Sequence, residues 1–498
     1  MMKKIIVTGA TLLMALFIAA PSFAIETKVT GTFTLDGVLD SNPTMTSNDD
    51  AKETISYREM QLRINTETQI NDKIKFLTRI DILDKLLSSK ETNSVMENSE
   101  DDDNIQFDRA WMEITSPVGL FKIGRKEGVK WGTDFYDDGK AYGTDRAEWI
   151  VPIDLGEGNK FYVVAVTEKA LETLETNRDN DKYYITGTYV TKQFRTGLLL
   201  GYYNYNSNVQ ENWNGTSAAE MGADTAAFGA AYAAYVGGTG TLAALQAAGA
   251  TLGGDLLQYS PRVDGSVFYA APYFKGMLGP VNINAEFGYV SGELEIKPDA
   301  AAVTAATALG LSPYGKKDVN LMCYWVEAGY PIDKANIELG YAFMSGDKDG
   351  MSGDVENAGA LGQGEDWEKV FILTGDDHGM DSTLGGVGGA DGEGNILSVG
   401  SDMNTAGMNL MYLGGSYQVN DSLSLSGLFA YATADEAPTG YKDDYGMEMD
   451  LRLSVKFLGN LEYNAVAGYL MSGDFWKQGT TNKVEDVIAL YHEIVLSF

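Results

Sequence analysis

The last twelve residues constrain this chain more than any other stretch. Residues 487–498 contain no Gly or Pro, alternate apolar and polar positions like a strand, and stop on Phe498. Chain termini usually fray into water, so an apolar strand at the very end needs a partner. A closed β-barrel supplies one, because its last strand pairs with its first and leaves no open edge.

This ending resembles the C-terminal signature of bacterial outer-membrane β-barrels, whose final residue is usually Phe. The resemblance implies that Ile494, Leu496 and Phe498 take part in barrel closure and act as the signal for the barrel-assembly machinery. His492 departs from the pattern, since it falls on the apolar face, and a place in the aromatic girdle at the membrane surface would accommodate it.

The first 24 residues have the three parts of a secretory signal peptide. Lys3 and Lys4 supply the charged region, residues 5–20 are apolar, and Ser22-Phe23-Ala24 supplies a cleavage pattern. The apolar run is short for an uncleaved membrane anchor. We therefore expect two parts, a signal peptide at 1–24 and a single outer-membrane barrel at 25–498, in a Gram-negative bacterium.

Period-two patterning and turn residues predict an all-β, antiparallel, up-and-down transmembrane barrel of about eighteen strands, with sixteen as the fallback. Short turns rich in Gly, Asn, Asp and Pro alternate with long polar loops, as in barrels with periplasmic turns at one rim and outer loops at the other. The predicted strands are 28–39, 55–69, 73–84, 104–116, 119–127, 146–155, 159–169, 181–192, 194–205, 262–277, 281–295, 317–331, 335–346, 405–419, 422–434, 443–458, 461–473 and 484–498.

Two loops, 206–261 and 347–404, are too long to be idle connectors. Either could fold inward and narrow the lumen, as one long loop does in trimeric porins, or both could lie on the outer surface. Strands 119–127, 194–205, 317–331 and 405–419 alternate poorly, so their two faces cannot be assigned from the sequence.

Several strands place charged side chains on one face and apolar ones on the other. Because a charge facing lipid costs about 2–4 kcal/mol at mid-bilayer, the charged faces should point inward and line a water-filled lumen. Rings of such charges set ion preference in wide pores. The predicted pore-lining set is Arg63, Lys73, Lys75, Arg79, Arg109, Glu113, Arg125, Arg262, Glu286, Glu338, Glu448, Asp450 and Arg452.

Residues 121–126 end in Gly124-Arg125-Lys126, and Trp131-Gly132 follows shortly afterwards. This Gly-Arg…Trp-Gly arrangement resembles the alginate-export and related anion or sugar porin families. The resemblance implies that Arg125 lines the pore.

The remaining features narrow the partners. With 70 acidic against 37 basic residues, the net charge of −33 argues against nucleic acid. Cys323 is the only cysteine, so no intramolecular disulfide can form, and we expect it to be buried. Two Ser-Gly-Asp ends, at Asp347 and Asp474, are strand terminators first, with weak calcium binding as the alternative. No other metal site is predicted.

Catalysis is not expected, because the two histidines, His378 and His492, are far apart and no catalytic constellation accompanies them. No cofactor motif is present. The first hypothesis is a porin that passes small hydrophilic solutes or ions through the outer-membrane lipid. The alternatives are a barrel that sheaths a partner such as a cytochrome, and a secreted soluble β-protein. A homotrimer and a monomer both stay open.

Overall fold

The computed structural model describes residues 25–41, 54–87, 105–128, 131–133, 135, 144–171, 179–207, 263–296, 315–347, 354–358, 367, 369–374, 406–437, 440–477 and 483–498. The predicted signal peptide, residues 208–261 of the predicted loop 206–261, most of the loop 347–404, His378 and Arg262 lie outside the described residues.

The described chain is almost entirely β-structure. A single short 3-10 helix, η4 (Asp474–Lys477), lies within it, and no described helix is long and apolar enough to cross a membrane. The strands are β1 (Glu26–Ser41), β2 (Thr54–Asn71), β3 (Ile74–Leu86), β4 (Ile105–Ser116), β5 (Gly119–Lys126), β6 (Thr144–Gly156), β7 (Asn159–Leu171), β8 (Asn180–Val190), β9 (Phe194–Ser207), β10 (Val263–Leu278), β11 (Val281–Ile296), β12 (Gly315–Ile332), β13 (Ala335–Met344), β14 (Met408–Asn420), β15 (Leu423–Thr433), β16 (Asp444–Phe457), β17 (Leu461–Ser472) and β18 (Val487–Ser497).

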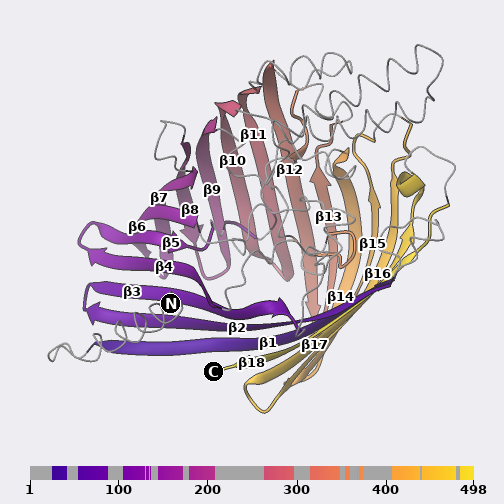
Figure 1. Ribbon diagram of the computed structural model, residues 1–498, viewed down its shortest axis with the longest axis horizontal. Coiled ribbons are helices and arrows are strands. Elements are labelled where there is room, and N and C mark those ends of the chain that lie inside the picture. Colours follow the sequence, from indigo (N-terminus) through magenta and orange to yellow (C-terminus); the bar gives the residue numbers. More distant parts are fainter. Residues whose placement is uncertain are drawn as a thin grey trace, which may run out of the picture.

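These eighteen strands form one closed antiparallel barrel. Each pairs with its neighbours in the sequence, and β1 pairs with both β2 and β18. Figure 1 shows the strands following one another around the barrel in chain order, with β1 (indigo) beside β18 (yellow). The predicted fold class and strand number are confirmed.

The last residue of the chain completes the ring. The Gly31 N–H donates to the Phe498 carbonyl at 2.8 Å, and the Phe498 N–H donates to the Gly31 carbonyl at 3.0 Å. Further along, Ile494 pairs with Leu35 and Leu496 with Phe33. The Phe498 ring lies over Gly31, where an added Cβ would come within 2.6 Å of a ring carbon.

The two faces of each strand follow the predicted alternation where the sequence shows it. On β16, Met447, Met449 and Leu451 are exposed on the outer face, whereas Glu448 and Asp450 are buried on the inner face. On β18, His492 shares the exposed outer face with Leu490 and Ile494, and its ring lies 6.1 Å from that of Tyr463. On these two strands, apolar side chains therefore face outward and charged ones inward.

Three strands that alternate poorly in the sequence, β9, β12 and β14, carry apolar side chains on both faces. On β12, Leu321, Cys323 and Trp325 are buried inside the barrel, while Met322 and Val326 are exposed outside. β9 and β14 follow the same rule, because their inner faces also belong to a buried core. Cys323 is buried in this wall, as expected.

The seam between β1 and β18 allows a test of closure. We expect Gly31→Ala to lower the stability of the barrel by about 1–3 kcal/mol, because its Cβ would collide with the Phe498 ring and the Arg63 carbonyl. The temperature at which the folded band disappears in heat-modifiable gel migration measures this. Gly427→Ala is the matched control, since its nearest contacts are 3.4 and 3.5 Å away. Equal losses in both variants would contradict the tight seam.

Candidate functional site

The inner surface of the barrel divides into two parts. From β2 to β8 the wall carries paired charges, and we call this the charged arc. From β9 to β17 the wall is mainly apolar and is covered by two segments of the loops, and we call this the packed arc. Any solute passing through the barrel meets these two different surfaces.

Ion pairs run along the charged arc from strand to strand. Arg63 on β2 contacts Asp81 on β3 at 2.8 Å, and Arg79 contacts Asp108 on β4 at 2.8 Å. Arg109 reaches Asp108 at 3.0 Å. Asp108 is an extra residue at a bulge where β4 pairs with β3, and the bulge brings it beside both arginines.

This row of ion pairs, which we call the belt, continues to β8. Arg109 contacts Glu127 at 2.7 Å, and Arg146 on β6 donates to the Glu127 carbonyl oxygen. Arg146 also lies 3.9 Å from Glu168 on β7, which Lys182 on β8 approaches at 3.6 Å. Positive and negative side chains therefore alternate around seven strands.

This alternation weakens any one-sided field across the lumen. Most of the predicted pore-lining residues on β2 to β5 are basic, and the structure places a carboxylate beside their arginines. Lys126 with Glu148 at 2.8 Å, and Lys122 with Glu113 at 3.1 Å, add two further pairs. Removing one partner of a buried pair, such as Lys126 with Glu148, costs about 3–5 kcal/mol.

Residues 131–133 and 135, in the loop between β5 and β6, lie against the packed arc. The Trp131 indole N–H donates to the Ala271 carbonyl at 2.9 Å, and its ring meets Tyr273 edge-on. The Thr133 backbone N–H and hydroxyl both donate to the Glu286 carboxylate, the former at 2.8 Å. The sequence did not mark this loop as one that folds inward.

Part of the loop 347–404 also enters the lumen, as one of the two alternatives for that loop allows. Glu448 accepts the backbone N–H groups of Ile372 at 2.5 Å and Leu373 at 2.9 Å. Asp450 accepts that of Phe371 at 3.0 Å. The turn closes on itself through Thr374, whose N–H donates to the Val370 carbonyl at 3.1 Å. Two wall carboxylates thus hold three backbone N–H groups of a turn.

Lys369 anchors the other side of this turn. Its ammonium lies 2.6 Å from Glu327 and 2.7 Å from Glu338. Glu327 also accepts the Tyr412 hydroxyl at 2.7 Å. The Arg452 guanidinium donates to the Lys369 carbonyl at 3.2 Å. We call these contacts, with those of Glu448 and Asp450, the loop clamp.

The two inward segments meet through aromatic rings. The ring centroid of Phe135 lies 5.2 Å from that of Trp367, edge-on, and 6.2 Å from that of Trp325 on the wall. The ring centroids of Trp367 and Tyr412 are 6.3 Å apart. Burying each ring contributes roughly 1.5–3 kcal/mol. The cluster, with the clamp below it, fixes both loops against β10 to β16.

The predicted pore-lining residues therefore fall into different groups. Arg63, Lys75, Arg79, Arg109 and Glu113 lie on the charged arc; Lys75 contacts Glu67 at 2.5 Å. Five others lie in the packed arc beneath the loops: Glu286, Glu338, Glu448, Asp450 and Arg452. Lys73 is in the turn between β2 and β3, where its N–H donates to Asn71.

Arg125 is set apart from this arrangement. The unbroken register of β4 and β5 puts it on the same face as Ile123, opposite Lys122 and Lys126. It pairs with Asp145 at 2.8 Å, and both side chains are more than half exposed. The position differs from the pore-lining one that the family resemblance implied.

The two Ser-Gly-Asp ends also differ from each other. Asp347 is buried beside β12, whereas Asp474 begins η4 and contacts Lys477 at 2.5 Å. Among the described residues, no group of three or more His, Cys, Asp or Glu side chains is placed to hold a metal ion. Weak calcium binding at these aspartates stays a prediction.

Comparison with known proteins bears on the fold. No family model and no curated protein matches the chain. Pseudomonas aeruginosa OccK8 (OprE) aligns with a TM-score of 0.50 at 12% identity, over 95% of this chain and 98% of that one. The outer membrane protein opdK of the same bacterium gives 0.47 and 10%, over 95% and 99%. OmpT of Vibrio cholerae, in its trimer form, gives 0.41 and 10%, over 95% and 100%.

The chain has the outer-membrane porin fold. The identities are low, so this likeness concerns the backbone and not the lumen. The chemistry of this porin barrel has to be read from its own charged arc and loop clamp.

The loop clamp makes a prediction about opening. Glu448→Gln keeps the shape of the side chain but replaces one of the two acceptor oxygens with an amide NH₂ group, so the N–H groups of Ile372 and Leu373 cannot both be accepted. The loss of about 1–3 kcal/mol should make openings of larger conductance roughly ten times more frequent. Single-channel recording in planar bilayers measures this.

Glu157→Gln, in the turn between β6 and β7, is the matched control for that variant. Its record should equal that of the parent protein. If Glu448→Gln also leaves the record unchanged, the loop clamp does not limit the current.

Proposed function

We propose that this protein is an outer-membrane porin that lets small hydrophilic solutes or ions diffuse passively through a narrowed, charge-lined lumen. The observation that carries the proposal is the belt of charged side chains from Arg63 to Lys182 on the inner face of a closed barrel. No residue acts as a reactant. The size of the lumen and its charges select what passes.

The charged arc supports this reading on energetic grounds. Charged side chains on a barrel wall need water or an oppositely charged partner, because burying an unpaired charge is costly. An interior that excluded water would be lined by apolar side chains instead. Arg63 and Lys182 keep 29% of their side-chain surface exposed, and Glu127 keeps 52%. These groups offer hydrated contacts along one side of the barrel.

The sheath hypothesis is less well supported. A barrel that encloses a partner protein needs a wide, empty lumen. Here Trp131, Phe135 and Trp367 already occupy part of the lumen and are buried there. The porin hypothesis uses such inward segments as a constriction.

The proposal includes the route by which the protein reaches its membrane. Residues 1–24 direct export and are cleaved, and the barrel-assembly machinery inserts the rest into the outer membrane of a Gram-negative bacterium. Ile494, Leu496 and Phe498 provide the assembly signal, since they sit on the outer face of the closing strand. The short turns then face the periplasm and the long loops face outward.

Ion selectivity tests the role of the charged arc. The purified protein in a planar bilayer should conduct ohmically. Arg63→Gln should raise the K⁺ to Cl⁻ permeability ratio about fourfold, because a unit charge about 10 Å away in water shifts the energies of K⁺ and Cl⁻ by about 0.4 kcal/mol each, in opposite directions. Reversal potentials in a KCl gradient measure the ratio.

Lys192→Gln removes the same charge from the turn after β8 and serves as the control. Its reversal potential should match that of the parent. A protein that never conducts would contradict the proposed function, and equal shifts in both variants would remove the charged arc as the selectivity element.

A further inference from the structure

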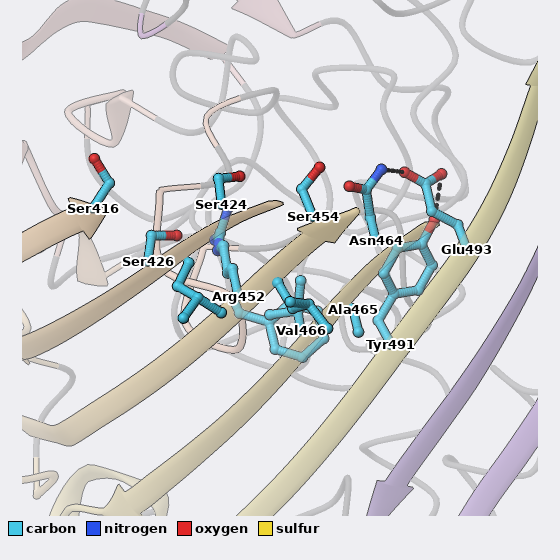
Figure 2. A pocket seen from close by; sticks show the side chains of 13 residues that line it. Ser416, Ser424, Ser426, Arg452, Ser454, Asn464, Ala465, Val466, Tyr491 and Glu493 are labelled. Carbon is cyan, nitrogen blue, oxygen red and sulfur yellow. Dashed lines mark hydrogen bonds between the residues drawn. The ribbon is translucent and has the colours of Figure 1, made fainter. Parts of the chain in front are cut away.

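A pocket of about 370 Å³ opens on the inner wall of β14 to β18, beside the loop clamp. It lies near the short-turn ends of these strands, apart from the charged arc. Figure 2 shows the side chains of Ser416, Ser424, Ser454 and Asn464 rising from neighbouring strands toward the same side. The volume falls at the small end of the roughly 300–1,000 Å³ typical of small-molecule sites.

The strand register arranges the pocket in two rows. The first row crosses four strands as Ser424, Ser454, Asn464 and Glu493, each paired with the next. The second row crosses five strands, two residues further along each. With strands about 4.8 Å apart and rows about 6.7 Å apart, the two rows match the outline of one or two sugar rings. The second row is Ser416, Ser426, Arg452, Val466 and Tyr491.

The rows are rich in groups that both donate and accept hydrogen bonds. Four serine hydroxyls line the pocket. That of Ser454 donates to Glu462 at 2.8 Å and can still accept a hydrogen bond, while a serine hydroxyl in general can give one hydrogen bond and receive others. Serine is a poor strand former, and its small side chain leaves the space that a larger residue would fill. Hydroxyl groups of a solute offer the same dual capacity, so they pair with such a wall without a mismatch.

One end of the pocket is preorganised. Glu493 accepts the Asn464 amide N–H at 2.7 Å and the Tyr491 hydroxyl at 3.2 Å. Both bonds appear in Figure 2. They fix the carboxylate, whose remaining lone pairs can accept further hydrogen bonds from a solute.

The charges of the pocket balance. Among the described residues that line it, Arg452 and Glu493 are the charged ones, one of each sign. Arg452 also donates to the Lys369 carbonyl and so joins the pocket to the loop clamp. A net anion gains from the arginine and loses from the glutamate, and a net cation does the reverse. A neutral solute can use both groups as a donor and an acceptor.

The pocket also has an apolar side. Phe371 comes from the clamped turn, and Tyr491 and Val466 come from the wall. An aromatic ring presents an apolar face with a polar edge or handle. The C–H face of a pyranose matches that face, while its hydroxyls reach the serines.

We propose that this pocket is a binding subsite for a neutral polyhydroxylated solute, such as a monosaccharide. The inference rests on the proposed function, because it names a solute class for the same lumen. The loop clamp contributes Phe371 and orients Arg452, so the subsite and the constriction are one unit.

Equilibrium dialysis of the full-length protein in detergent, with radiolabelled glucose, tests the subsite. Binding should saturate. Asn464→Ala and Glu493→Gln should each weaken it about tenfold, as expected for losing hydrogen bonds that include one to a charged group. Asn65→Ala, on the inner face of β2, is the matched control and should bind as the parent does.

Competition by gluconate and glucosamine distinguishes a neutral site from a charged one. Neither should displace glucose better than unlabelled glucose does. An affinity for gluconate more than tenfold higher than that for glucose would overturn the proposal in favour of an anion site. Absent saturation, or full binding by Asn464→Ala with a correctly folded barrel on the gel, would overturn it as well.

The same preparation in planar bilayers separates the two proposals. Current without glucose binding would remove the subsite and keep the channel. Glucose binding without current would keep the subsite and remove the channel.

Discussion

The backbone hydrogen bonds between β1 and β18 are the constraint on which the rest depends. Lipid offers no partner for an open strand edge, so a sheet that crosses a membrane has to close. The chain closes by placing its last residue against Gly31, with two backbone bonds and a ring stacked over a missing side chain. Once the ring is closed, alternate residues of every strand must face a shared interior.

That interior has two solutions to the same problem. On the charged arc, side chains such as Arg79 and Asp108 form ion pairs with one another. On the packed arc, the chain covers its wall with its own loops and holds them through Glu448, Asp450 and Lys369. Turn N–H groups need acceptors and wall carboxylates need donors, so each supplies what the other lacks.

Where one face of a strand is polar, the sequence alone predicts both the strand and the face that points inward. β16 is an example, because Met449 and Asp450 point to opposite environments. The sequence does not assign the faces of β12. A period-two pattern is visible only when the two faces differ in polarity, and the side chains of Cys323 and Met322 differ little in polarity. An apolar inner face is meaningful only when its cover is known, and that cover comes from residues far away in the chain, such as Phe135 and Trp367.

The site could be predicted in part for the same reason. Periodicity placed Arg63 and Glu448 on inner faces, yet it carried no information on which of them a loop would cover. The sequence does not reveal the pocket, because Ser424 and Ser426 are ordinary residues in isolation. Only the pairing register aligns them with Asn464 and Glu493. Arg125 was placed through a short motif, and the register of β5 puts it on the other face.

Disulfide formation across the seam tests closure most directly. Leu35 and Ile494 are paired on the outer face, so cysteines at both positions in a Cys323→Ser background should cross-link within the folded protein. Leu39 with Ile494 is offset by four residues, about 13 Å, and should not. Efficient cross-linking of the first pair alone is the predicted result. Equal cross-linking of both pairs, or of neither, would contradict a closed ring in this register.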